Sequence, residues 1–172
     1  MRKEVEFTSI FPETLEMMKG QGVILLAGDP PNPMTIGWGT LGYIWGKLIL
    51  TVLVRPSRFT YTRLESSTEF TVNLLPKAFS RQLSLCGSKS GRDVDKIAKC
   101  GFRMEQGIKI KTPHIQESSV HFECRIIHKN DLLEETLDKG IVEKYYPQKD
   151  LHRVYYGEVF GVFREVDERM NG

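Results

Sequence analysis

Short apolar segments, each bounded by turn-forming residues, are the feature that most constrains the fold of this chain. Apolar, β-branched and aromatic runs separated by clusters of glycine, proline, asparagine and aspartate are typical of antiparallel strands. We therefore expect a mainly β fold, in which the sheet closes into a barrel or rolls up. The expected strands lie at 22–28, 34–45, 47–54, 69–75, 115–128, 141–146 and 153–166.

One of these segments shows the alternation of a strand clearly. Within residues 119–128, every second residue from Val120 to Ile126 is apolar, while His121, Glu123 and Arg125 stand between the apolar positions. Successive side chains of a strand point to opposite faces of the sheet. The pattern therefore predicts a half-buried strand, with the polar residues on the solvent side.

Three stretches have the apolar spacing of helices, and we expect them to lie at the periphery of the sheet. They are 56–67, 77–87 and 91–101, and the last two end in a glycine suited to cap a helix C-terminus. The region 129–152 reads as an excursion between the last strands. Residues 1–172 are accordingly expected to form one domain, mainly β with peripheral helices.

Charge, hydropathy and cysteine usage limit the kinds of binding partner and the cellular location that we expect. The 24 Lys+Arg nearly balance the 22 Asp+Glu, which gives no net field that would predict nucleic-acid binding. The apolar runs are shorter than the roughly 20 residues of a membrane helix, and the N-terminus lacks a signal peptide's apolar region, so no membrane partner is expected. The cysteines are odd in number and do not have the spacing of a zinc site, so we expect reduced thiols and a cytoplasmic location. They are Cys86, Cys100 and Cys124.

Two segments combine hydroxyl and basic side chains where helices are expected to begin. The first is Arg55–Thr60, directly after a strand, and the second is Ser88–Arg92. Free N–H groups at a helix N-terminus, together with serines and arginines, suit a phosphate dianion. The alternative is that the serines only cap helices and the arginines are solvated, the commoner fate of a single motif of this kind.

A third segment suits a flat ligand. Residues 30–40 form a proline-rich turn that runs into a strand, where Trp38 stands between Gly37 and Gly39. Prolines stiffen the turn, and glycines allow a planar ring to approach the backbone. The alternative is a turn followed by a core tryptophan.

Several enzyme classes lack their motifs in this chain. The sequence contains no Walker A loop, no H-E-x-x-H and no G-x-S-x-G, so P-loop kinases, zinc proteases and serine hydrolases are not indicated. The four histidines occur singly, and the alternation of strand faces would separate them. The sequence therefore predicts no metal site. These histidines are His114, His121, His128 and His152.

Six motifs, in order and spread over most of the chain, resemble the flavin reductase-like, FMN-binding split-barrel family, and most closely its flavoredoxin branch. They are NPMTIGW at 32–38, RPSRFTYTRL at 55–64, EFTVNL at 69–74, GSKSGRDVDK at 87–96, TPHIQESSVHFEC at 112–124 and YYGEVFGVF at 155–163. The longer 129–152 excursion departs from many relatives. Such a loop could form a lid or partner contact, or be surface decoration.

This resemblance implies an FMN-binding split β-barrel that forms a homodimer, with FMN at the subunit interface. The isoalloxazine ring would lie against Asn32, Met34, Thr35 and Trp38, with Asn73 nearby. The phosphate would be held by Arg55, Ser57, Arg58 and Thr60 and by Ser88, Lys89, Ser90, Gly91, Arg92 and Lys96.

The same resemblance implies electron transfer through FMN, and it assigns no catalytic side chain because the flavin carries the chemistry. The leading hypothesis is an FMN-dependent oxidoreductase that passes electrons from NAD(P)H or a protein donor to an acceptor. The alternative is a non-enzymatic FMN electron carrier that docks to redox partners, and a third is a module that senses or stores flavin. Reduction of the flavin by NADH or NADPH separates the first two.

Overall fold

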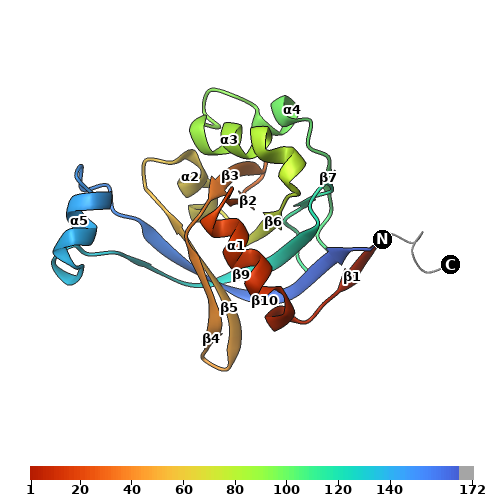
Figure 1. Ribbon diagram of the computed structural model, residues 1–172, viewed down its shortest axis with the longest axis horizontal. Coiled ribbons are helices and arrows are strands. Elements are labelled where there is room, and N and C mark those ends of the chain that lie inside the picture. Colours follow the sequence, from red (N-terminus) through yellow and green to blue (C-terminus); the bar gives the residue numbers. More distant parts are fainter. Residues whose placement is uncertain (167–172) are drawn as a thin grey trace.

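The fold of this chain, seen in a computed structural model that describes residues 1–166, is dominated by one antiparallel sheet (Figure 1). Its strand order is β3-β2-β6-β9-β10-β5-β4, and β1 pairs with β10. The strands are β1 Arg2–Glu4, β2 Val23–Ala27, β3 Asn32–Ile36, β4 Gly39–Ile44, β5 Lys47–Val54, β6 Glu69–Leu74, β9 Val120–Asp131 and β10 Arg153–Glu165. A separate short pair joins β7, Met104–Glu105, to β8, His114–Ile115.

Five α-helices lie around the sheet within the described residues. They are α1 Phe11–Lys19, α2 Phe59–Glu65, α3 Ser80–Ser88, α4 Lys96–Cys100 and α5 Lys139–Tyr145. Figure 1 shows α2, α3 and α4 gathered at one end of the sheet, while α5 stands at the tip of a ribbon formed by β9 and β10. Short 3-10 turns cover Phe7–Ile10, Lys77–Phe79 and Glu134–Thr136. The mainly β architecture with peripheral helices is as the sequence predicts.

Three expected strands differ from the structure. The segment 115–128 is interrupted at 116–119, so that β8 ends at Ile115 and β9 begins at Val120. The segment 34–45 is divided between β3 and β4, because the chain turns at Gly37 and Trp38. The segment 141–146 is not a strand but most of α5. The carboxylate of Asp138 accepts hydrogen bonds from the backbone N–H groups of Gly140 and Ile141, and this N-cap starts a helix where the apolar residues alone suggested a strand.

The strand β9 is buried on both faces, so the prediction of a half-buried strand is wrong for its first half. His121 and Glu123 are fully buried, like the apolar residues between them, and only from Arg125 onward is the polar face exposed. The reason is the segment before β8. The backbone N–H groups of Ile108 and Lys109 bond to Glu123 and close the face that the alternation had assigned to solvent.

The helices around the second basic segment also differ from expectation. Residues 88–92 do not begin a helix, because they follow the C-terminus of α3, and α4 begins only at Lys96, after its N-cap Asp95. Gly87 lies inside α3 and does not cap it. Gly101 does cap α4 as predicted, in the left-handed conformation that glycine favours, at φ 68°.

Candidate functional site

Three adjoining cavities follow the end of the sheet where α2, α3 and α4 meet. The first, the apolar cavity, measures about 280 Å³ and is lined by β3, the end of β5 and His152. The second, the basic cavity, measures about 240 Å³, and it shares Met34 and Arg58 with the first. A third cavity of about 440 Å³ shares Phe59 and Gly91 with the second. Together the three form one elongated groove.

The apolar cavity is named for one part of its lining, which also contains Arg55, Arg58 and His152. Met34, Leu53 and Val54 contribute to its lining, and Trp38 stands at its edge. The Trp38 side chain is 42% exposed, so it is not a core residue. Its indole packs edge-on against Tyr145 at 5.0 Å between ring centroids, and at 5.3 Å from His152. A planar ligand in this cavity would therefore meet an indole that remains accessible.

The basic cavity gathers hydroxyls and cations from two distant segments. Its lining contains four cationic side chains and no carboxylate. Such a cavity suits a phosphate, because charge-assisted hydrogen bonds to anions are the stronger ones. The residues that line it are Met34, Ser57, Arg58, Phe59, Thr60, Ser88, Lys89, Ser90, Gly91, Arg92 and Lys96. We call residues 88–96 the basic loop.

Lys96 holds the basic loop to the body of the protein. Only 3% of this residue is exposed, and its ammonium donates to the carbonyls of Pro33 at 2.9 Å and Cys86 at 3.0 Å. Burial lowers the pKa of Lys96, although the two carbonyls solvate its charge. The lysine therefore joins β3, α3 and α4 at the floor of the basic cavity.

Two arginines connect the walls of the same cavity. Arg58 donates to the Gly87 carbonyl at 2.7 Å, and Arg92 donates to the Ser57 carbonyl at 3.1 Å. Gly91 lies so close to Asn32 that a Cβ at this position would overlap with the asparagine side chain. The loop backbone can thus approach β3 only with glycine at this position.

A long excursion reaches the groove from the other side. We call residues 132–152, which contain α5, the α5 arm. Arg55 donates to the carbonyls of Tyr145 at 2.8 Å and Asp150 at 3.1 Å, and its guanidinium lies 5.0 Å from the ring centre of Tyr146. Ser57 donates its hydroxyl to a carboxylate oxygen of Asp150 at 2.5 Å. The arm therefore occupies two side chains that the sequence assigned to the phosphate.

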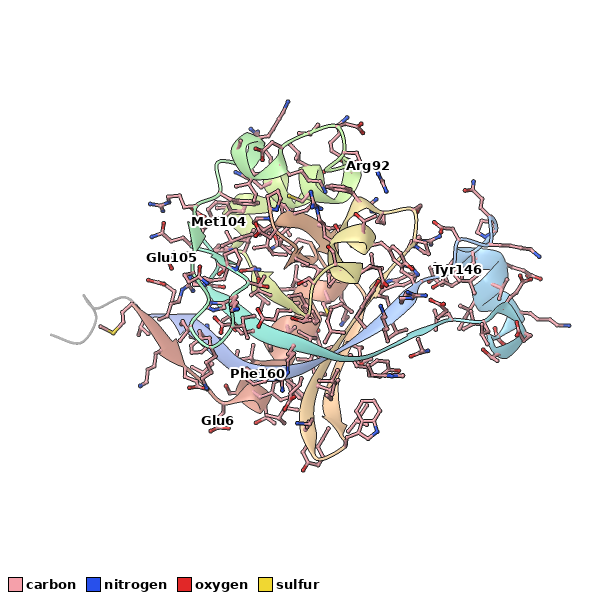
Figure 2. All side chains as sticks on the ribbon, turned by 180° about the vertical axis from the view of Figure 1, so that it is seen from behind. Glu6, Arg92, Met104, Glu105, Tyr146 and Phe160 are labelled. Atoms are coloured by element: carbon pink, nitrogen blue, oxygen red, sulfur yellow. The ribbon has the colours of Figure 1, made fainter. Side chains whose placement is uncertain are left out.

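The arm also brings a histidine to the apolar cavity. Nδ1 of His152 lies 2.7 Å from the hydroxyl of Tyr146, which Figure 2 labels on the arm. Burial, together with the charge of Arg55, lowers the pKa of His152 to about 4. The imidazole is therefore neutral at pH 7. Burial likewise raises the pKa of Tyr146, so the pair stays uncharged at the cavity wall.

Most of the residues predicted from the sequence come together in this groove. Met34, Thr35, Trp38, Arg55 and Arg58 line the apolar cavity; Ser57, Thr60, Ser88, Lys89, Ser90, Gly91, Arg92 and Lys96 line the basic cavity; Asn32 lines the third and donates to Thr60 at 2.8 Å. Asn73 is different. It is fully buried, and its amide bonds to Thr71 and to the backbone of Ile24 and Ile115 in the core.

Sequence reasoning missed Phe59, Gly87, Asp150 and His152. Gly87 and His152 line the apolar cavity, and Phe59 lines the basic one. The arginines 63 and 92 lie over the Phe59 ring at 4.6 and 5.4 Å from its centroid. Phe59 stands directly after Arg58 in the basic segment 55–60, and this position was the available signal.

A cluster of histidines lies away from the groove. His114 and His121 stack with centroids 3.7 Å apart, against the expectation that strand alternation separates them. Glu105, which Figure 2 shows at the opposite end of the molecule from Tyr146, bonds to His114, and Glu123 bonds to His121. Both oxygens of Glu123 accept backbone N–H groups. The ligand atoms of His114, His121 and Glu123 lie within 4.8 Å of one another, a spacing that suits a metal ion and that the sequence did not predict.

Comparison with known protein families identifies the architecture. Residues 19–171 match the family model described as the flavin reductase like domain. The chain belongs to the flavin reductase-like family. Two curated relatives, uncharacterized proteins of Archaeoglobus fulgidus and Aquifex aeolicus, are 25% and 26% identical over 69% and 65% of this chain. The chain spans 66% and 50% of the lengths of these relatives.

Solved structures show the same flavin reductase-like split barrel. A flavoredoxin from Methanosarcina acetivorans gives a TM-score of 0.67 at 23% identity, over 83% of this chain and 67% of that one. An FMN-binding protein from Thermus thermophilus gives 0.65 at 20% identity, over 86% and 73%. The NADH:FAD oxidoreductase SgcE6 from Streptomyces globisporus gives 0.62 at 19%, over 83% and 74%. Within residues 1–166, no helix is long and apolar enough to cross a membrane.

Proposed function

We propose that this flavin reductase-like protein is an FMN-binding oxidoreductase, which passes electrons from NAD(P)H or a protein donor through bound FMN to an acceptor. One observation carries the proposal. A cavity with an accessible indole adjoins a cavity lined by four cations, and Met34 and Arg58 line both, an order that suits a flavin ring followed by its terminal phosphate. The solved structures described as flavoredoxin and as FMN-binding protein support the same choice.

The residues present fit this cofactor. Met34, Thr35 and Trp38 would lie against the ring system, while Arg58, Arg92 and the hydroxyls of the basic loop would hold the phosphate. Lys96 donates two of its three ammonium protons to carbonyls, so it would contribute its positive charge and one remaining proton from the cavity floor. When bound, the flavin supplies hydride acceptance and onward electron transfer, and the protein supplies position and electrostatics.

FMN is favoured over riboflavin by the basic cavity, and this gives the first test. The purified protein, mixed with each flavin, is expected to bind FMN at least tenfold more tightly in a fluorescence titration, since losing a charge-assisted contact costs about 1.5–3 kcal/mol. Equal affinities would contradict the assignment of the phosphate. A parallel titration with FAD reports which flavin the groove prefers.

Whether the protein is an enzyme or an electron carrier is tested by finding which electron donor reduces the bound flavin. The FMN-loaded protein is mixed anaerobically with NADH or NADPH in a stopped-flow instrument, and the flavin absorbance is expected to bleach within the time of turnover. If only a chemical reductant or a reduced partner protein bleaches it, the protein is an electron carrier instead.

We further propose that the protein works as a homodimer in the cytoplasm, with FMN at the subunit interface. Large apolar side chains are exposed on the β4–β5 hairpin and on β9. A twofold dimer is the commonest way to cover such a surface. The residues are Tyr43, Ile44, Trp45, Leu48 and Ile127. Light scattering of the FMN-loaded protein tests this, and a monomer that binds FMN fully would contradict it.

A further inference from the structure

Two cysteines flank the basic loop in sequence and meet beneath it in space. Cys86 lies on α3, directly before the loop, and Cys100 is the last residue of α4, directly after it. Their Sγ atoms are 3.8 Å apart. Neither thiol has a role in the proposed electron transfer, and both are free. The contact is therefore a feature that the proposed function leaves unexplained.

The separation is close to what a disulfide needs. A disulfide has an S–S distance of about 2.05 Å, so the two sulfur atoms must approach by less than about 2 Å. The helix α4 is only five residues long and ends at a left-handed Gly101. A short helix bounded by loops on both sides can move by this amount together with a change of side-chain rotamer.

The contact between α3 and α4 at these cysteines also positions Lys96, which forms the floor of the basic cavity. Lys96 stands one helical turn before Cys100, and its ammonium donates to the carbonyl of Cys86 at 3.0 Å. Any change in the spacing of α3 and α4 at the cysteines therefore acts on Lys96 as well. On the α3 side, the next residue after Cys86 is Gly87, whose carbonyl accepts from Arg58.

We propose that Cys86 and Cys100 form a reversible disulfide that fixes the basic loop and slows the release of flavin from the protein. The effect on flavin rests on the proposed function, whereas the disulfide itself does not. The oxidant is hydrogen peroxide. Its O–O bond breaks, the two thiols lose two electrons and two protons, the S–S bond forms, and two molecules of water are released.

Exposure decides the order of the two steps. Cys100 is 9% exposed and Cys86 is 0% exposed, so peroxide reaches Cys100 first and forms a sulfenic acid, with loss of one water. The Cys86 thiol then attacks that sulfur and releases the second water. Burial raises the pKa of both thiols, that of Cys86 to about 12, so the reaction is slow compared with an exposed redox sensor.

The consequence follows from what holds the loop. In the reduced protein, Lys96 ties residues 88–96 to β3 and α3, and Arg92 ties them to the Ser57 carbonyl between β5 and α2; these hydrogen bonds can open one at a time. A covalent link at the base of the loop removes the openings that separate α4 from α3. The phosphate then leaves less often, so an exchangeable flavin becomes a retained one.

The experiment compares one protein in two redox states. The FMN-loaded protein is treated with hydrogen peroxide and its disulfides are mapped by mass spectrometry under non-reducing conditions. FMN release is then timed by fluorescence, with a flavin-binding apoprotein as a trap. We expect a Cys86–Cys100 linkage, release at least threefold slower than in the reduced protein, and return to the original rate with dithiothreitol.

Matched controls separate the possible outcomes. Cys100→Ser should bind FMN like the wild type and show no change of release on oxidation; Cys124, which is fully buried on β9, should remain a free thiol in the oxidised wild type. The inference is overturned if both thiols stay free, or if the linkage forms and release is unchanged. If FMN does not bind at all, the proposed function fails, while linkage and a raised Tm of the flavin-free protein still report on the disulfide.

Discussion

Asp150 of the α5 arm places a negative charge beside the proposed phosphate site, and removing that charge should tighten FMN. The Ser57 hydroxyl has one proton and donates it to Asp150 at 2.5 Å. It therefore cannot donate to a phosphate at the same time. Asp150→Asn keeps an oxygen that can accept from Ser57, and it keeps the backbone carbonyl that Arg55 uses. The substitution thus changes charge with little change of shape.

The magnitude follows from the geometry. A phosphate within hydrogen-bonding reach of Ser57 would lie about 6 Å from the carboxylate, given the usual O···O distance of about 2.7–2.8 Å. Two unit charges at that separation repel by about 0.7 kcal/mol at the dielectric constant of water, and a phosphate charge near −2 doubles this to about 1.4 kcal/mol. Because Asp150 is only half-buried, the value for water applies. We expect about tenfold tighter FMN binding.

The assay is a fluorescence titration of wild type and Asp150→Asn with FMN and with riboflavin. Riboflavin carries no phosphate, so its affinity should not change. Glu143→Gln makes the same change of net charge on an exposed residue of α5 and should leave FMN affinity within twofold. The gain for FMN should shrink as salt is added. An equal gain for riboflavin, or no gain for FMN, would refute the electrostatic argument.

Three further predictions concern single groups. Arg92→Ala should lower the affinity for FMN tenfold to a hundredfold in a titration, because a charge-assisted contact contributes about 1.5–3 kcal/mol. Arg81→Ala, on the exposed side of α3, should leave this affinity unchanged. FMN binding should strongly quench the fluorescence of Trp38, and it should quench that of Trp45 less, because Trp45 packs on His128 and Tyr156 at the hairpin turn. Trp38→Ala should weaken FMN binding several-fold, because aromatic stacking contributes about 0.5–1.5 kcal/mol. Circular dichroism checks that this variant is folded. In the folded protein, burial and the neighbouring His121 lower the pKa of His114 to about 4. In the unfolded chain this histidine has a pKa of about 6.5, so between these two pH values the unfolded chain binds more protons than the folded protein. Stability in urea should therefore be lost as pH falls from about 6.5 towards 4, by up to about 1.4 kcal/mol per pH unit for each such proton, and His114→Gln should flatten this slope.

The strands were predictable because their evidence is local. Alternation and β-branched composition identify β2, β5, β6 and β10 to within a residue or two of their bounds. The same local evidence failed at α5, since its isoleucine, valine and tyrosines resemble a strand until the capping carboxylate of Asp138 is taken into account. The N-terminal β1 and α1 were not anticipated. The strand β1 is three residues long and exists only because β10 offers it an edge.

Most residues that line the groove were predictable from the sequence, but the distant residues that reach it from the α5 arm were not. Met34, Trp38 and the cations of the basic loop stand in short motifs whose composition is informative on its own. Asp150 and His152 reach the groove only because the ribbon of β9 and β10 carries the chain out and back. Burial of His121 and Glu123 likewise depends on a distant segment that closes the second face of β9. Tertiary contacts of this kind leave no periodic signal in the sequence.

The basic cavity has two walls, and each carries a separate control over the phosphate. Asp150 acts on the wall formed by residues 55–60, whereas Cys86 and Cys100 act on the basic loop. Two hydrogen bonds join the two sides of the cavity, from Arg92 to the backbone carbonyl of Ser57 and from Arg58 to that of Gly87, and neither uses the Ser57 hydroxyl that Asp150 engages.

The two controls should therefore act independently. Effects at separate groups usually add to within about 0.3–0.5 kcal/mol, which is about a twofold error in an affinity. We expect Asp150→Asn to tighten FMN by the same factor, within twofold, in the reduced and the peroxide-oxidised protein. The measurement is the FMN titration repeated in both states. A factor that differs more than this would mean that the disulfide moves the Ser57 wall as well as the loop, through Arg92, and Arg92→Ala should then abolish the difference.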